Sequence, residues 1–134
     1  MQSNNASAIT SPNLMNMKRF RNLEIVNHEN KAVGNIQDYI LNVLDLSIDY
    51  VVVSLETSLG IKDKLYILPW QALKLDNNDL RFILPIDVTK LRNAPGYHSD
   101  WPETPEESLL AEVNNFYSEI SKKSISDTRI QNIN

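Results

Sequence analysis

The 134-residue sequence contains no cysteine and only 3 glycines. Without cysteine there is no disulfide, no thiolate nucleophile and no thiolate-held zinc or iron–sulfur cluster. Three glycines are too few for a glycine-rich phosphate-binding loop or for a repeat array. Basic charge is also scarce, with 13 Lys and Arg against 17 Asp and Glu, so nucleic acid is disfavoured as a partner because it binds basic surfaces.

Long apolar runs are missing as well. Residues 1–16 read MQSNNASAITSPNLMN, which lacks the basic start and apolar core of a secretory signal. No stretch approaches the ~20 apolar residues of a membrane-spanning helix. We therefore expect a cytoplasmic protein with one domain, long enough to bury a hydrophobic core.

Short runs of β-branched and aromatic residues predict a mainly β fold. Strands are expected over 23–26, 32–39 with a continuation to 46, 50–56, 64–68 and 81–86. Val51–Val53 would be apolar on both faces, as in the central strand of a closed sheet. Pro85 would mark an edge strand because proline has no N–H for the ladder. Turns are expected at 27–30, 45–49, 57–60 and 76–79, with helical turns at 70–73 and 87–94.

One amphipathic helix follows the strands. Thr104 is a candidate N-cap, Pro105 would occupy the first helical position, and Glu107 lies three residues after the cap, which is a helix-start pattern. Lys122 and Lys123 suit the C-terminal end. The apolar residues fall on one stripe: Leu109, Leu110, Val113, Phe116, Tyr117 and Ile120.

These elements predict a small β-barrel or roll of five to six strands with a C-terminal amphipathic helix. The predicted organisation has four parts: a disordered polar tail at 1–17, a barrel domain at 18–100, a helix at 101–123 and a polar tail at 124–134. The helix would dock on the barrel or on a partner, and docking within the chain is the favoured alternative because it enlarges a small core.

Several short motifs occur in a fixed order. A strand ending in Val26-Asn27 precedes a glycine-bearing strand, a valine-rich strand, a Leu-Gly-Ile loop, a Pro-Trp pair and an Asn-Ala-Pro-Gly-Tyr stop. The glycine-bearing strand is Ala32–Leu41, the valine-rich strand is Tyr50–Ser54 and the Leu-Gly-Ile loop is Leu59–Lys64. The Pro-Trp pair begins the segment Pro69-Trp70-Gln71-Ala72-Leu73. Ile86-Asp87-Val88 with Leu91 precedes the Asn-Ala-Pro-Gly-Tyr stop at Asn93–Tyr97. Their order and spacing over 23–97 resemble a PRC-barrel domain, the fold of the photosynthetic reaction-centre H subunit and of the ribosome-maturation factor C-terminal domain.

The segment after these motifs is similar to that of the free-standing, stress-associated PRC-barrel proteins, where a Trp-Pro pair precedes a helix that ends in aromatics. Here these are Trp101-Pro102 and Phe116-Tyr117. Ser47-Ile48-Asp49 stands where the family often has a glycine. The resemblance implies a non-enzymatic adaptor, often dimeric, with no catalytic residues and no cofactor. It would bind a protein partner or itself. The alternatives are a ribosome- or RNA-maturation module and an accessory subunit of a membrane complex.

Candidate sites outside the resemblance are weak. His28 and His98 lie too far apart for a short-spaced metal motif, and no serine sits in a Gly-x-Ser-x-Gly elbow. Turn or helix-start roles are favoured for the three acidic clusters: Asp45/Asp49, Asp76/Asp79 and Glu103/Glu106/Glu107. Asp76-Asn77-Asn78-Asp79 lacks the glycine and distal glutamate of a calcium loop.

Aromatic and basic residues leave two further alternatives. A solvated surface is favoured for Lys18, Arg19 and Arg21, with contact to lipid or RNA as the alternative, and core packing is favoured for Trp70. Trp101 would dock the helix or lie in a dimer interface, where aromatic residues are enriched. The candidate partner or dimer surface therefore consists of Trp101, Leu110, Val113, Phe116 and Tyr117.

Overall fold

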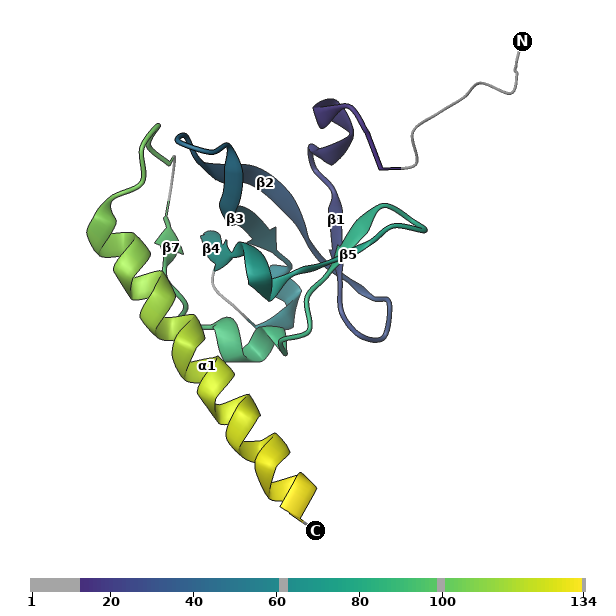
Figure 1. The fold of residues 1–134 in the computed structure, drawn as a ribbon, viewed down its shortest axis with the longest axis vertical. Helices are drawn as coiled ribbons and strands as arrows, with labels where there is room; N and C mark the ends of the chain where they lie inside the picture. Colours follow the sequence, from purple (N-terminus) through teal and green to yellow (C-terminus); the bar gives the residue numbers. More distant parts are fainter. Residues whose placement is uncertain (1–12, 61–62, 99–100, 134) are drawn as a thin grey trace.

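A β-sheet and one long helix form the molecule in a computed structural model that describes residues 13–60, 63–98 and 101–133 (Figure 1). The strands are β1 (Glu24–Val26), β2 (Ala32–Asn42), β3 (Ser47–Leu55), β4 (Leu65–Pro69), β5 (Lys74–Asp76), β6 (Arg81–Ile83) and β7 (Gly96–Tyr97). Four 3-10 turns and one helix accompany them: η1 (Met17–Phe20), η2 (Thr57–Leu59), η3 (Trp70–Ala72), η4 (Val88–Leu91) and α1 (Glu107–Ile133). Of the predicted tail at 1–17, residues 1–12 lie outside the described residues.

The strands form one sheet in the order β5-β6-β1-β2-β3-β4-β7. All neighbouring strands are antiparallel except β1 and β6, which are parallel. The predicted mainly β roll with a C-terminal helix is therefore confirmed. The sheet is open instead of closed, because no pairing among the described residues joins β5 to β7.

The hydrophobic core is built around β3. Val51, Val52 and Val53 are all fully buried, which confirms that this strand is covered on both faces. Trp70 in η3 packs edge-on against Phe82, with ring centroids 5.5 Å apart, and against Tyr39 at 6.3 Å. The core-packing role predicted for Trp70 and the helical turn predicted around it are both confirmed.

Some strand boundaries differ from the prediction. β2 ends at Asn42 and does not continue to residue 46, so the turn to β3 covers 43–46 instead of 45–49. β6 ends at Ile83, and it lies between β5 and β1 inside the sheet. The edge position inferred from Pro85 is therefore wrong, since this proline lies outside every strand. The sequence does not predict β5 and β7, because strands of three and two residues are too short to show alternation.

Helix α1 begins later and ends later than predicted. The Leu110 N–H donates to the Glu106 carbonyl, so the first turn starts after Glu106 and not at Pro105. The prediction that the helix ends at Lys123 is wrong, since α1 extends to Ile133. No glycine or proline occurs after Pro105, so nothing in the sequence breaks the helix there. In Figure 1 the first half of α1 lies along β4 and β7, and its C-terminal end projects past the sheet.

Candidate interaction surface

The turn between β2 and β3 is held by polar groups that bond to its own backbone. The Leu46 N–H donates to the Asn42 carbonyl at 2.7 Å, and the Leu44 N–H donates to Asn42 Oδ1 at 2.9 Å. The Asp45 carboxylate accepts from the backbone N–H of Ser47 at 3.0 Å and from the Ser47 hydroxyl at 2.8 Å. These two bonds, the backbone one first, hold the pKa of Asp45 below its usual range.

The side chains that this turn directs outward are aliphatic. Val43 is 82% exposed, Leu44 93% and Leu46 72%, and Leu41 at the end of β2 is also exposed. We call residues 41–46 the hairpin tip. In Figure 1 it projects from the upper end of the sheet, where β2 and β3 meet. Single exposed apolar side chains are ordinary, whereas several at one protruding point mark an interaction site.

The backbone of the hairpin tip is strained at one residue. Leu46 has a φ of 61°, in the left-handed region that bulky residues rarely adopt. Asn22 and Asn30 occupy the same region elsewhere in the chain, and asparagine tolerates it better than leucine does. Leu46 therefore stands where the local backbone favours a different residue.

The charged side chains of the hairpin itself are all acidic. β2, β3 and the turn between them contain Asp38, Asp45 and Asp49 and no Lys or Arg. The indole Nε1 of Trp101 donates to Asp38 Oδ2 at 2.7 Å, which holds the half-exposed Trp101 ring beside β2. The hairpin thus presents apolar side chains at its point and carboxylates on its flanks.

The five residues predicted as a partner surface lie at two separate places. Val113 and Tyr117 are buried in the core of their own chain, and Leu110 and Phe116 are half-buried beside them on α1. This half of α1 docks on β4 within the chain, so Val113 and Tyr117 offer no surface to a partner. Trp101 instead lies beside Asp38 of β2, three residues before the hairpin tip. The remaining partner contacts of Leu110 and Phe116 stay a prediction.

The hydroxyl of Tyr117 is buried without a hydrogen-bond partner among the described residues. Burial, followed by the influence of Tyr66, raises the pKa of Tyr117 well above its ordinary value. Burial also raises the pKa of Tyr39 to about 12, but the Tyr39 hydroxyl donates to the Phe20 carbonyl at 2.6 Å. The Tyr50 hydroxyl donates to Asn114 Oδ1 at 2.9 Å and so links β3 to α1.

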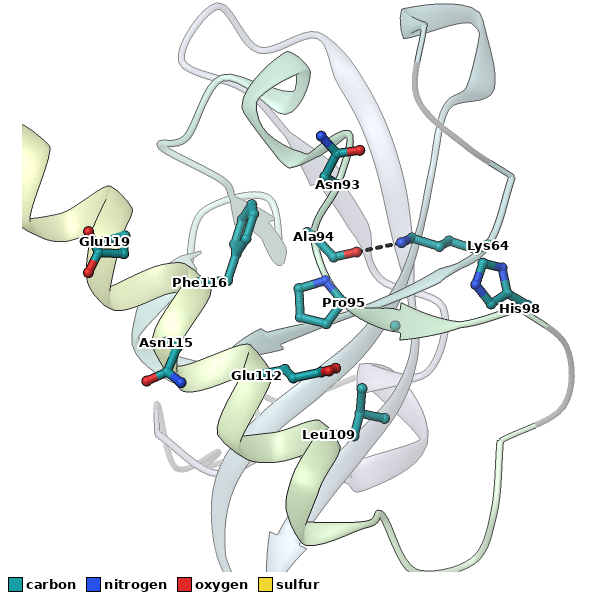
Figure 2. A pocket seen from close by; sticks show the side chains of 11 residues that line it. Lys64, Asn93, Ala94, Pro95, His98, Leu109, Glu112, Asn115, Phe116 and Glu119 are labelled. Atoms are coloured by element: carbon teal, nitrogen blue, oxygen red, sulfur yellow. Dashed lines mark hydrogen bonds between the residues drawn. The ribbon is translucent and has the colours of Figure 1, made fainter.

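A shallow cleft of about 560 Å³ lies between α1 and the segment that leads into β7. Figure 2 shows Leu109 and Glu112 reaching from α1 toward Pro95, with His98 beyond Lys64 on the far side. The Lys64 ammonium donates to the Ala94 carbonyl and lies 5.1 Å from the centroid of the Tyr66 ring. Lys64 is therefore engaged in holding the chain that forms the cleft wall.

The turn roles predicted for acidic residues are visible in the hydrogen bonds. The Asp76 carboxylate accepts from the Asn78 N–H at 3.1 Å and pairs with Arg81 at 3.2 Å, which is turn chemistry and not cation binding. His28 Nε2 lies 3.1 Å from the Pro85 carbonyl oxygen. In the described part of the chain, no three His, Asp or Glu side chains are grouped to hold a metal ion.

The sequence does not predict the hairpin tip, because the apolar residues 40–46 favour a strand. The available signal was the placement of Asn42 and Asp45, whose side chains can cap backbone N–H groups two residues onward. Reading those two residues as turn formers would have left Val43, Leu44 and Leu46 in the turn itself.

The family model of the PRC-barrel domain matches residues 12–90. No curated protein matches the chain. Within the described residues, no helix has the length and apolar character needed to cross a bilayer.

Proposed function

The chain belongs to the PRC-barrel family, and we propose that it acts as an adaptor that binds protein through its hairpin tip. The observation that carries the proposal is the group of aliphatic side chains at 41–46, which are exposed at the end of a long, well-paired hairpin. A binding role of this kind needs no catalytic group and no cofactor.

The size of the tip sets the strength of binding that it supports. Fully burying a valine or leucine side chain contributes about 1.5–3 kcal/mol, so Val43, Leu44 and Leu46 together offer roughly 4–9 kcal/mol. Association costs at least about 4 kcal/mol in lost freedom. The tip alone therefore supports weak binding, and a specific complex needs further contacts around it.

The charge of the hairpin itself indicates the class of partner. Asp38, Asp45 and Asp49 repel anionic lipid headgroups and phosphate backbones. A protein surface with an apolar depression and basic residues at its rim complements both the aliphatic point and the carboxylates. This favours a protein partner over direct binding of the hairpin to RNA or to a lipid surface.

Site-specific photo-crosslinking tests the proposal. A photoreactive amino acid replaces Val43 in the full chain expressed in cells, and adducts are identified by mass. We expect protein adducts at Val43. The matched control places the same group at Glu29, which is exposed in the turn before β2 and lies at the far end of that 11-residue strand, about 35 Å away.

Two results would contradict the proposal. One is an absence of protein adducts at Val43 when the yield of labelled chain equals that of the Glu29 control. The other is a set of adducts at Val43 that consists of lipid or RNA.

A further inference from the structure

The chain carries a second exposed apolar group, in a segment of opposite charge. Leu14 is 78% exposed, Met17 is 76% exposed, and Met15 between them is also exposed. Lys18, Arg19 and Arg21 follow directly and are exposed too. No Asp or Glu occurs before Glu24. We call residues 14–21 the basic segment.

The basic segment also has a hollow. Leu14, Met15, Asn16 and Arg19 line a depression of about 370 Å³. Its lining combines apolar side chains with one guanidinium group. A depression of this composition accepts an aliphatic side chain that is flanked by a carboxylate, and the hairpin tip presents that combination.

The basic segment is attached to the same end of the sheet as the hairpin tip. The Tyr39 hydroxyl of β2 donates to the carbonyl of Phe20 in η1 at 2.6 Å. Tyr39 lies three residues before the end of β2, which is roughly 10 Å along the strand. Figure 1 shows η1 and the hairpin tip both at the upper end of the molecule.

We propose that the occupant of the hairpin tip is a second copy of this chain, which receives Leu44 of its partner in the hollow of its own basic segment. The inference rests on the proposed function, because it names the partner of the same surface. Charge complementarity supports this inference. The hairpin has carboxylates and no Lys or Arg, whereas the basic segment has Lys and Arg and no carboxylate.

The placement of the two surfaces also determines the form of the assembly. Because both lie at one end of the molecule, two copies related by a two-fold axis bury both tips in both hollows. Such an isologous contact closes on itself and produces a dimer instead of a fibre. Every substitution at the contact then acts twice in the assembly.

The test is sedimentation equilibrium of the purified full chain over a range of concentrations and salt. We expect a dimer of twice 15.3 kDa that dissociates on dilution and weakens as salt rises. Leu44→Ser should weaken association by about tenfold or more. Asp49→Lys and Arg19→Glu should each weaken it, and the double variant should recover most of the loss, because it restores opposite charges across the contact.

Lys90→Glu is the control for charge reversal. Lys90 is exposed in η4, on the lower side of the sheet in Figure 1 and away from both surfaces. This variant should dimerise as the unmodified chain does. Circular dichroism confirms that each variant is folded.

Several results would overturn the inference. A chain that stays monomeric at every concentration excludes the second copy, as does a dimer that Leu44→Ser leaves unchanged or a double charge variant that recovers nothing. If the chain is monomeric while Val43 forms adducts with a different protein, this inference fails and the proposed function stands. Flotation with anionic vesicles that depends on Leu44 would instead show a lipid surface, and both proposals would fail.

Discussion

Replacing Leu46 with asparagine should stabilise the folded chain. A leucine in the left-handed region costs roughly 1–2 kcal/mol relative to ordinary backbone angles, and its φ of 61° places Leu46 there. Asparagine tolerates this region, as Asn22 and Asn30 show in the same structure. The leucine side chain is mostly exposed, so its removal gives up about 0.5 kcal/mol of burial. The expected net gain for Leu46→Asn is therefore about 0.5–1.5 kcal/mol.

Urea unfolding followed by far-UV circular dichroism measures this gain. The midpoint should rise with no change in slope, and the thermal midpoint should rise by about 4 °C for a gain of 1 kcal/mol. The protein concentration must be low enough to keep the chain monomeric, because association adds to apparent stability. Leu44→Asn is the control, since Leu44 lies in the same turn, is even more exposed than Leu46 and has no positive φ. Its stability should change by less than about 0.5 kcal/mol.

The same substitution should weaken association, because it removes an aliphatic side chain from the hairpin tip. Stability and binding would thus change in opposite directions. If Leu46→Asn instead loses 1 kcal/mol or more, the Leu46 side chain packs within the chain, and the argument from strain is refuted. If stability rises and dimerisation is unaffected, the strain is real, but Leu46 takes no part in the contact.

Two further predictions concern the core. Gly34→Ala should destabilise the fold by about 1–3 kcal/mol in urea unfolding, because a Cβ would collide with the Ser54 carbonyl oxygen on β3. The control Ala32→Gly on the same strand should lose only about 0.5–1 kcal/mol. Equal losses for the two variants would contradict the close approach of Gly34 to β3. Tyr117→Phe should be neutral or stabilising by about 1 kcal/mol at pH 7, because it removes a buried hydroxyl without a partner. Burial raises the pKa of Tyr117 in the folded state, so the unfolded chain releases this proton first and the free energy of unfolding falls above pH 10. In Tyr117→Phe that fall should be shallower by up to about 1.4 kcal/mol per pH unit. An unchanged pH profile would refute the burial of the Tyr117 hydroxyl.

The sequence predicts the centre of the sheet better than its ends. Val51–Val53 show a long apolar pattern, and burial on both faces follows from it directly. The ends of the strands depend on individual hydrogen bonds, which the spacing of apolar residues does not reveal. Asn42 ends β2 because its carbonyl and its side chain both accept from the turn. β7 exists because the chain after Pro95 meets β4, a long-range contact that two residues alone do not encode.

The predicted partner surface shows the same limit. The stripe on α1 was correctly recognised as apolar, but a stripe does not say whether it faces the same chain or another. The structure packs α1 against β4 and buries Val113 and Tyr117 in the core, while the other residues of the stripe are half-buried. The apolar residues that remain exposed lie in a turn. The β-branched residues and the alternation of this stretch favour a strand, so the sequence predicts a strand where the hairpin tip lies.

Two leucines in the described chain have a positive φ, and their surroundings differ in a way that bears on function. Leu80 is half-buried and packs against the core, so lost contacts would offset any relief of its strain. Leu46 has the same kind of backbone angle but is exposed, so its side chain gains little burial in return. Folding alone would favour asparagine at residue 46. A leucine there is explained if its side chain becomes buried in a complex, which is why the tests of stability and of association at this residue must be made together.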